Sequence, residues 1–411
     1  MRRRDGERMT LDRSASAVLL WPSLAVMRSL GRLGVPVFCL DPDGTAPATA
    51  SRYCREAFSW DLRAADPERS IEFLATIAQR VGGRPILMAV NDDPGAIFMA
   101  EHGRTLARWY RLQHPSAALA TGLSNKEDMF HLCMCHGVPT PGALFPKSRA
   151  DVEGAVGDIE FPIVLKGIDT ELQARRSGTR MAIVHDRQEL LARYDELEDP
   201  ASPNLMLQEY IPGGADSIWM FNGYFDADSR CLLGFTGRKL RQCPVRTGAT
   251  SLGVCARNEV VEQLVVAFMK ALGYRGALDL GFRYDRRDGQ YKLLDVNPRI
   301  GATFRLFVDD NDLDVARALH LDLTGRPVTP GTYREGRKWI DEYADLTSSY
   351  RYIREGDLRI RDWLRSFQGI EEGQLLARDD VAPVAQMAVN FARNGIRRVA
   401  RPTATVKRLH G

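Results

Sequence analysis

The sequence of 411 residues lacks the features that mark several large classes of protein. It has no run of about 18 apolar residues, so we expect no transmembrane helix. Its seven cysteines form no CxxC pair, and no His/Cys cluster has the spacing of a zinc site. An odd number of cysteines in a chain of this length is typical of reduced thiols, which favours a cytoplasmic protein.

The sequence also lacks a large excess of charge of either sign. Lys and Arg total 56 against 53 for Asp and Glu, so the net charge is +3 and no general attraction to nucleic acid is expected. The hydrophobic fraction of 44% is that of a globular protein, and the length suggests about two to three domains. The seven histidines lie in no catalytic motif, so no nucleophile–histidine arrangement is recognisable.

The first 120 residues alternate between short apolar runs and helical periodicity. Because strands alternate with helices, we expect an α/β domain with a doubly wound parallel sheet over residues 14–120. Residues 1–13 mix acidic and basic side chains and are expected to form a disordered tail. The expected elements are strands at 16–21, 35–41 and 85–90 and a helix at 23–34.

Residues 121–330 contain longer strands and fewer helices. A polar stretch at 121–130 opens a helix, and the later strands are joined by short turns, which is typical of antiparallel pairing. The expected elements are strands at 161–167 and 204–214, a hairpin over 217–240, an amphipathic helix from Val260 to Leu272, and strands at 276–285 and 290–299.

Residues 331–411 are expected to form a helical extension with a basic end, since no acidic residue follows Asp380. Such an end can dock on an acidic lipid surface or on a partner, whereas a solvated helix is the more common role of such charge. The basic residues are Arg393, Arg397, Arg398, Arg401, Lys407 and Arg408.

The segment LDVNPR, residues 294–299, carries the clearest chemical signal. On a strand, Asp295 and Asn297 project to the same face because side chains alternate with period two. A carboxylate and an amide oxygen suit a hard cation such as Mg²⁺, and Arg299 just beyond the strand can hold a phosphate or a carboxylate. The alternative is a strand end capped by Asn-Pro, with Arg299 in an exposed salt bridge.

Two residues on other strands strengthen this interpretation. Asp279 lies in the otherwise apolar ALDLGF, where a lone carboxylate is costly unless it is paired or binds metal. We therefore regard Asp279 as a second candidate metal ligand. Lys166 ends the apolar strand FPIVLK and is placed to reach a phosphate, with a surface lysine as the alternative.

Two further segments suit a nucleotide. RRSGTR, residues 175–180, is a Gly/Ser/Arg loop whose backbone N–H groups around Ser177 and Gly178 can cover phosphates. In QEYIPGGAD, Glu209 is followed seven residues later by Asp216. The extended edge can bind an adenine, and the second carboxylate can take the ribose hydroxyls.

In this order, the segments resemble the ATP-grasp superfamily in its carboxylate–amine ligase branch, which includes D-alanine–D-alanine ligase, D-aspartate ligase, biotin carboxylase and the carbamoyl-phosphate synthetase large chain. The resemblance covers about residues 15–330 and rests on SNKEDMF, FPIVLKG, the Gly/Ser loop, QEYIPGGADS and LLDVNPR together. It implies an ATP-grasp fold over 121–330, in which a small lid subdomain at about 145–212 and a larger subdomain at about 213–330 clamp ATP.

The resemblance also implies roles for single residues. Lys126 and Lys166 resemble the two lysines that contact nucleotide phosphates, and Asp216 resembles the ribose-binding acid. Glu209 resembles the acid near the adenine amino group, with backbone contacts from Tyr210 and Ile211. Asp295 resembles the carboxylate that bridges two Mg²⁺ ions, Asn297 the ligand of the second ion, and Arg299 the arginine that stabilises the transferring phosphate.

The sequence departs from the family pattern at the first metal ligand. Alignment places Gly281 where relatives carry Glu, Gln or Asp, and Asp279 can substitute because it lies on the same strand face two residues earlier. Arg238 and Lys239 lie where relatives carry a basic residue near phosphate or substrate, and Arg305 is a candidate for binding a substrate carboxylate. Surface salt bridges are the alternative for these three.

The implied reaction joins a small-molecule carboxylate to an amine, such as an amino acid or a peptide-like substrate. The carboxylate attacks the γ-phosphate of ATP, and the amine then displaces phosphate from the acyl-phosphate. The implied cofactors are ATP and two Mg²⁺ ions, which Mn²⁺ can replace, and a homodimer is common among relatives. Two alternatives stay open, an ATP-grasp phosphotransferase (kinase) and a non-catalytic nucleotide-binding subunit.

Overall fold

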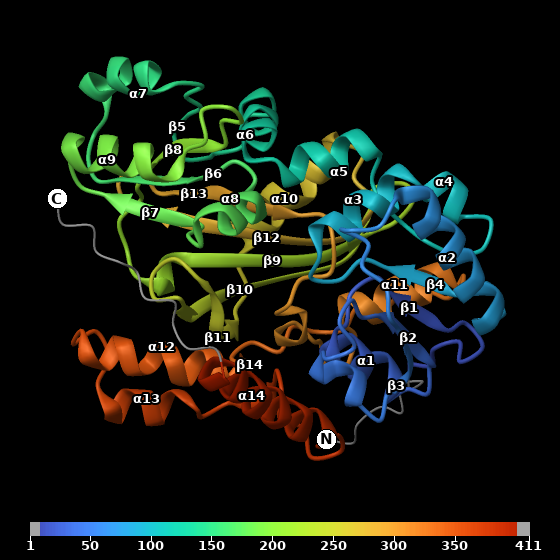
Figure 1. Ribbon diagram of the computed structural model, residues 1–411. Helices are drawn as coiled ribbons and strands as arrows, with labels where there is room; N and C mark the ends of the chain where they lie inside the picture. Colours follow the sequence, from blue (N-terminus) through green and yellow to red (C-terminus); the bar gives the residue numbers. More distant parts are fainter. Residues whose placement is uncertain (1–8, 401–411) are drawn as a thin grey trace.

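Three β-sheets organise the described part of the chain (Figure 1). The computed structural model describes residues 9–400, with side chains described as far as Arg393. A parallel sheet lies near the N-terminus, a small antiparallel sheet is built from the middle of the chain, and a long, largely antiparallel sheet lies between them. The C-terminal helices α12, α13 and α14 lie together along one side of the long sheet.

The N-terminal sheet has the strand order β3-β2-β1-β4 and is parallel throughout, as the alternation of strands and helices predicts. Strand β3 was not predicted, because its sequence CREAF is charged and only half-buried. We expected residues 1–13 to form a disordered tail, but the folded part begins earlier, since Leu11 is buried in the adjoining core. The elements are β1 (Ala17–Leu19), α1 (Leu24–Gly31), β2 (Val37–Leu40), β3 (Cys54–Phe58), α2 (Pro67–Val81), β4 (Ile86–Met88), α3 (Asp93–Glu101) and α4 (Gly103–Leu106).

The small antiparallel sheet has the order β5-β8-β6-β7 and a core of its own. The expected loop at 175–180 is partly helical, because Arg175–Ser177 form the last turn of helix α8. That helix ends at Gly178, whose φ of 70° is the left-handed conformation that favours glycine. The elements are β5 (Ala143–Leu144), α7 (Arg149–Ala155), β6 (Ile163–Gly167), α8 (Thr170–Ser177), β7 (Met181–Val184), α9 (Arg187–Leu197) and β8 (Leu205–Glu209).

The long sheet has the order β13-β12-β9-β10-β11-β14-β15. Helices α5, α6 and α10 cover one face, while α11 packs between the other face and the parallel sheet. The predicted hairpin and strand pair are confirmed within a few residues. The elements are α5 (Ala117–Ser124), α6 (Lys126–Cys135), β9 (Ile218–Phe225), β10 (Cys231–Cys243), β11 (Ala249–Cys255), α10 (Glu259–Ala271), β12 (Gly276–Asp285), β13 (Gln290–Asn297) and α11 (Val315–Leu323).

The extension after residue 330 is not wholly helical, which corrects the expectation. Two short strands, β14 (Lys338–Ile340) and β15 (Ile370–Gly373), continue the long sheet from β11. These strands were missed because each is very short and neither alternates strongly. Three helices complete the extension, α12 (Glu342–Arg354), α13 (Ile360–Ser366) and α14 (Ala382–Ala400). Of the predicted basic end, Arg393 is exposed, and the side chains from Arg397 onward lie outside the described residues.

The parallel sheet and the long sheet share one hydrophobic core, so they pack as neighbours. A parallel bridge between Val90 and Ile300 ties the end of β4 to the segment that follows β13. The end of β4 therefore lies directly beside the LDVNPR tip. Within residues 9–400, no helix combines the length and apolar character needed to cross a bilayer. All seven cysteines are free thiols.

Candidate active site

Two cross-strand rows place the predicted acidic and amide groups on one face of the long sheet. The pairing of β9, β12 and β13 aligns Asn222, Asp279 and Asn297 in one row. The next row contains Met220, Gly281 and Asp295. Because side chains alternate along a strand, the polar members of both rows project toward the same side.

Hydrogen bonds connect these groups. Asn222 donates from Nδ2 to Oδ1 of Asp279 over 2.7 Å, and Asn297 donates from Nδ2 to Oδ2 of Asp295 over 3.2 Å. Asn222 is fully buried and its own Oδ1 has no hydrogen-bond partner. The loop after the strand packs tightly here, since a Cβ at Gly301 would lie 2.4 Å from Oδ2 of Asp279.

Two lysines approach this face from the direction of the small sheet. Lys126 begins helix α6, whose N-cap Asn125 accepts hydrogen bonds from the N–H groups of Glu127 and Asp128. From this position the Lys126 ammonium forms an ion pair with Asp295. Lys166 lies on strand β6, and its buried ammonium is close enough to Lys126 and Asp295 for both charges to act on it.

The charges perturb one another strongly. Burial, followed by repulsion from Lys126, lowers the pKa of Lys166 to about 7. Burial works to raise the pKa of Asp295, but the charges of Lys126 and Lys166 outweigh it and hold the pKa at about 2. Burial raises the pKa of Asp279 to about 6, against the opposing effect of Arg299. Perturbation of this size in a group of convergent side chains is typical of functional sites.

Arg299 links this face to the parallel sheet. Its Nε donates to Oδ1 of Asp93 over 2.7 Å, and its Nη2 donates to Oδ1 of Asn297 over 3.2 Å. Asp93 is the first residue of helix α3, which follows β4 along the chain. The sequence signal for Asp93 was available in NDDPG, which follows a predicted strand, but no role was assigned to it.

Arg238 and Lys239 were predicted together, and the structure separates them. Arg238 aligns with Trp219 and Phe282, and its guanidinium lies 5.5 Å from the Trp219 ring on the face that α10 covers. Lys239 lies on the opposite face, where Asp279 and Asp295 partly offset the burial that lowers its pKa. Only Lys239 therefore joins the candidate site.

The segment predicted to bind adenine and ribose lies at the end of β8. Glu209 is paired with Arg287 and, at 3.4 Å, with the ammonium of Lys292. Neither cation was predicted, because each lies in a charged turn or strand without a distinctive pattern. Tyr210 and Ile211 follow directly along the chain, with Ile211 buried, while Asp216 is exposed on the short turn before β9.

Ser177 and Gly178 lie on the small sheet's side, at the end of α8. The Ser177 hydroxyl donates to the carbonyl of Gln173 over 3.0 Å and accepts from the N–H of Thr179 over 3.2 Å. The hydroxyl is thus used within the loop, whereas Gly178 has open space around it.

The donor set fits Mg²⁺ in type. Asp279, Asp295 and Asn297 offer hard oxygen ligands, and Mg²⁺ in nucleotide sites takes one or two carboxylates and receives the remaining ligands from phosphates and water. In the part of the chain with described side chains, no group of three or more His, Cys, Asp or Glu residues could hold a metal on its own. These residues therefore suit a metal that arrives with a nucleotide.

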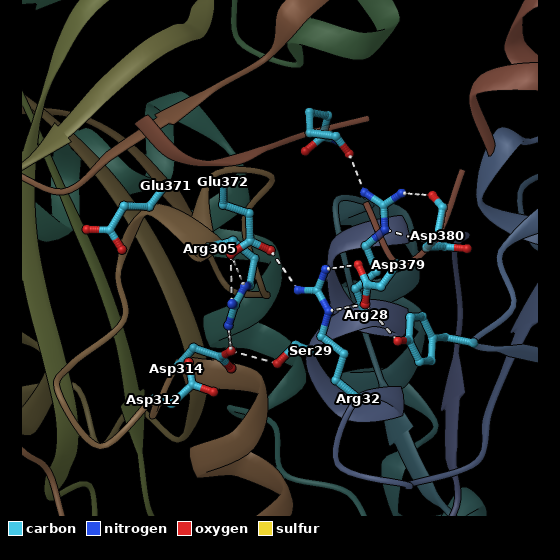
Figure 2. Close-up of polar contacts among 12 residues, drawn as sticks. Arg28, Ser29, Arg32, Arg305, Asp312, Asp314, Glu371, Glu372, Asp379 and Asp380 are labelled. Carbon is cyan, nitrogen blue, oxygen red and sulfur yellow. Dashed lines mark hydrogen bonds and ion pairs between the residues drawn. The ribbon is translucent and has the colours of Figure 1, made fainter. Parts of the chain in front are cut away.

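Arg305 does not belong to this site, which corrects its assignment to a substrate carboxylate. It is 4% exposed and donates from Nη2 to Glu372 over 2.7 Å, as well as pairing with Asp314 (Figure 2). The same view shows Arg28 of helix α1 bonded to Asp380, and Arg32, the C-cap residue of that helix, bonded to Asp379. These pairs fasten the C-terminal segment to the rest of the fold.

The sequence is similar to those of two curated proteins, both over part of their lengths. A D-aspartate ligase of Enterococcus faecium is 26% identical over 259 residues, which are 60% of this chain and 61% of the ligase. The N-terminal section of the carbamoyl phosphate synthase large chain of Methanopyrus kandleri is 22% identical over 211 residues, which are 48% of this chain and 36% of that protein. The chain thus spans less than two thirds of either relative. No family model matches it.

Solved structures establish the fold. N5-carboxyaminoimidazole synthetase from Staphylococcus aureus, complexed with ADP, superposes with a TM-score of 0.62 at 10% identity, covering 85% of this chain and 88% of that one. The biotin carboxylase domain of 2-oxoglutarate carboxylase from Hydrogenobacter thermophilus, in complex with MgADP, ADP and bicarbonate, gives 0.58 at 18% identity, with coverages of 79% and 73%. The chain therefore has the ATP-grasp fold, and the resemblance to carboxylate–amine ligases is supported.

Proposed function

We propose that this protein is an ATP-dependent ligase that activates a carboxylate as an acyl-phosphate and joins it to an amine. The observation that carries the proposal is the convergence of Lys126, Lys166, Lys239 and Arg299 on Asp279 and Asp295, between the small sheet and the long sheet. The similarity to D-aspartate ligase supports the same chemistry.

The reaction needs charge stabilisation more than covalent catalysis. An oxygen of the substrate carboxylate attacks the γ-phosphorus of ATP, the bond to the β,γ-bridging oxygen breaks, and ADP leaves. The amine then attacks the carbonyl carbon of the acyl-phosphate, phosphate leaves, and the amine loses one proton. Positioned cations lower the barrier to such transfers by stabilising the negative charge that moves between oxygens.

In this proposal, Lys126, Lys166 and Lys239 bind the nucleotide phosphates, together with the backbone at Ser177 and Gly178. Glu209, Tyr210 and Ile211 line the adenine position, and Asp216 takes the ribose. Arg299, held by Asp93, stabilises the phosphate in transfer. Asp279, Asp295 and Asn297 would hold Mg²⁺, two ions by analogy and Mn²⁺ as a substitute, which would neutralise phosphate charge when bound.

We propose an amino acid or a peptide-like compound as substrate, with D-aspartate as the first candidate because of the similarity to D-aspartate ligase. The end of the parallel sheet at Asp93 adjoins Arg299, and ligands of open α/β sheets commonly bind at that edge. A cytoplasmic location and a homodimer are part of the same proposal. The free state of all seven cysteines supports the location.

The test is Mg²⁺-dependent release of ADP and phosphate by the purified protein, measured against pools of acids and amines, with D-aspartate among the acids. We expect turnover that requires one acid and one amine, and a loss of at least a hundredfold in Asp295→Ala. Asp288→Ala, which removes an exposed carboxylate in the turn between β12 and β13, is the matched control.

Other outcomes of this assay would indicate another function. A stable phosphorylated acceptor formed without an amine would identify a kinase. Tight binding of ADP with no turnover in any pool would identify a nucleotide-binding subunit, and each of these outcomes would overturn the ligase proposal.

A further inference from the structure

The hairpin that carries Lys239 is irregular directly after this residue. The pairing of β10 with β11 shifts twice within four residues, so Leu240 on one strand and Ser251 on the other have no partner. A bulge of this kind interrupts the ladder and re-aims the side chains beside it. The register pairs are Lys239 with Gly253, Arg241 with Leu252, and Gln242 with Thr250.

Asp345 of helix α12 contacts both strands at this irregularity. It is 1% exposed, and its carboxylate accepts bonds from Nε and Nη2 of Arg241 over 2.7 and 2.9 Å. It also accepts a bond from the hydroxyl of Ser251, at 3.3 Å. Ser349 and Trp363 donate to the same carboxylate, each over 3.3 Å.

The extension holds the hairpin at two further points. Arg241 donates from Nη1 to the hydroxyl of Ser366, at the end of α13, over 2.8 Å. At the turn between the strands, Arg246 forms ion pairs with Glu355, at 2.9 Å, and with Asp357. Asp345 of α12, Glu355 and Asp357 just beyond that helix, and Ser366 of α13 therefore hold two arginines of the hairpin.

Lys239 faces the candidate active site across the sheet. Gly237 aligns with Met220, Gly281 and Asp295, and Lys239, two residues further along β10, projects from the same face. Its ammonium donates to the carbonyl of Gly248 over 3.1 Å, within the same hairpin. The position of Lys239 therefore depends on the geometry of the hairpin on both sides of the bulge.

We propose that Asp345 is a positioning residue for the phosphate end of the active site: by binding Arg241 and Ser251 it fixes the bulged hairpin that presents Lys239. The β10–β11 ladder is interrupted at Leu240 and Ser251, so the side-chain contacts from α12 add to the backbone bond over 2.8 Å that Asp341 donates to Ser251. This inference rests on the proposed function, in which Lys239 serves the nucleotide phosphates. It makes the C-terminal extension a part of the catalytic unit.

The experiment compares Asp345→Asn with Asp380→Asn. Both residues are buried carboxylates of the same extension that bind an arginine, but Asp380 binds Arg28 of helix α1 (Figure 2), whereas Asp345 binds Arg241 of the hairpin. We expect kcat to fall ten- to a hundredfold in Asp345→Asn, with KM for ATP within about twofold, and both parameters to stay near wild type in Asp380→Asn.

A coupling test separates positioning from general loosening. In a Lys239→Met background, Asp345→Asn should have almost no further effect on kcat, since its effect acts through Lys239. Ser251→Ala removes the hydroxyl that contacts Asp345 and Ser348 at the bulge, and this variant replaces Asp345→Asn if the latter does not fold. Ser251→Ala should lower kcat less than Asp345→Asn does. The proposal would be overturned by equal losses of kcat in Asp345→Asn and Asp380→Asn. It would also be overturned if the effects of Asp345→Asn and Lys239→Met on kcat were fully additive.

A readout independent of turnover is the acetylation rate of Lys239 by an N-hydroxysuccinimide ester, measured by mass spectrometry. We expect this rate to change at least threefold in Asp345→Asn or Ser251→Ala and to stay unchanged in Asp380→Asn. An unchanged rate in the first two variants refutes the positioning role even if the wild type turns over. If the wild type has no ligase activity but the rate changes as expected, the proposed function fails while the structural link between Asp345 and Lys239 stands.

Discussion

Arg299 and Asp93 are joined by a hydrogen bond of 2.7 Å, although they lie 206 residues apart in the sequence. The bond connects the tip of strand β13 to the first turn of helix α3 and is only partly exposed to solvent. The parallel sheet therefore fixes the direction of the arginine that we assign to the transferring phosphate.

This relationship predicts the effect of Asp93→Asn. The variant keeps the shape of the side chain but removes the charge that orients the guanidinium, so we expect kcat to fall about tenfold while the affinity for ADP changes little. Steady-state kinetics and an ADP titration measure the two quantities. Asp66→Asn, at the N-cap of helix α2, is the control, and an equal loss there would show that Asp93 has no special role.

The perturbed lysine predicts a pH dependence of nucleotide binding. The pKa of Lys166 is lowered to about 7 by burial and by Lys126, and a bound phosphate would raise it again. The affinity for ADP should therefore be greatest below pH 7 and fall, by up to tenfold per pH unit, as the pH rises above 7. Calorimetry in buffers of different ionisation enthalpy should detect proton uptake on binding at pH 8. Uptake should vanish in Lys166→Met and persist in Lys270→Met, on the surface of helix α10.

The identity of the first metal ligand can be tested at two neighbouring positions. Asp279→Asn should raise the Mg²⁺ concentration needed for half-maximal turnover by ten- to a hundredfold. A second change, Gly281→Glu, should recover much of the loss, because the nearest atom to a Cβ there is 3.9 Å away, on Asp295. No recovery, with correct folding, would indicate that position 281 cannot face the metal.

The same carboxylate adds a pH effect to the metal requirement. Burial raises the pKa of Asp279 to about 6, so the group becomes protonated as the pH falls through 6 and then cannot bind a cation. We expect the Mg²⁺ requirement of the wild type to increase below pH 6.5. A profile that does not change between pH 5.5 and 7.5 would count against Asp279 as a ligand.

Arg305 should affect stability and not catalysis. Arg305→Ala leaves the buried carboxylate of Asp314 and the partly buried carboxylate of Glu372 without this partner, which we expect to lower the free energy of unfolding by about 3–5 kcal/mol. Chemical denaturation measures this loss. KM for the acid substrate should stay unchanged at a temperature where the variant is folded, and a selective rise in this KM would instead restore the substrate-binding role.

The candidate site was predicted best where a residue type and its strand position carry the signal together. Asp295, Asn297 and Arg299 could be recognised because a buried strand that ends in DVNPR is chemically unusual. The segment NDDPG after a predicted strand pointed to Asp93 without giving it a role, and nothing pointed to Lys292, because isolated acidic and basic residues near turns are common. The roles of Asp93 and Lys292 depend on which helices and strands pack together, and the sequence around these residues does not show that packing.

The sequence by itself determined most of the helices and strands and the chemistry at the end of strand β13. Short apolar runs marked strands β1, β2 and β4 of the parallel sheet, which are buried on both faces, whereas alternation marked the antiparallel hairpins, because burial of one face imposes a period of two residues on a strand. Only the tertiary structure decided that Lys239 faces the site while Arg238 faces Trp219, that Arg305 is locked in an ion-pair cluster, and that Asp345 reaches Arg241. Such contacts join residues far apart in the chain, and their partners are chosen by the packing of whole sheets and helices, which no local pattern records.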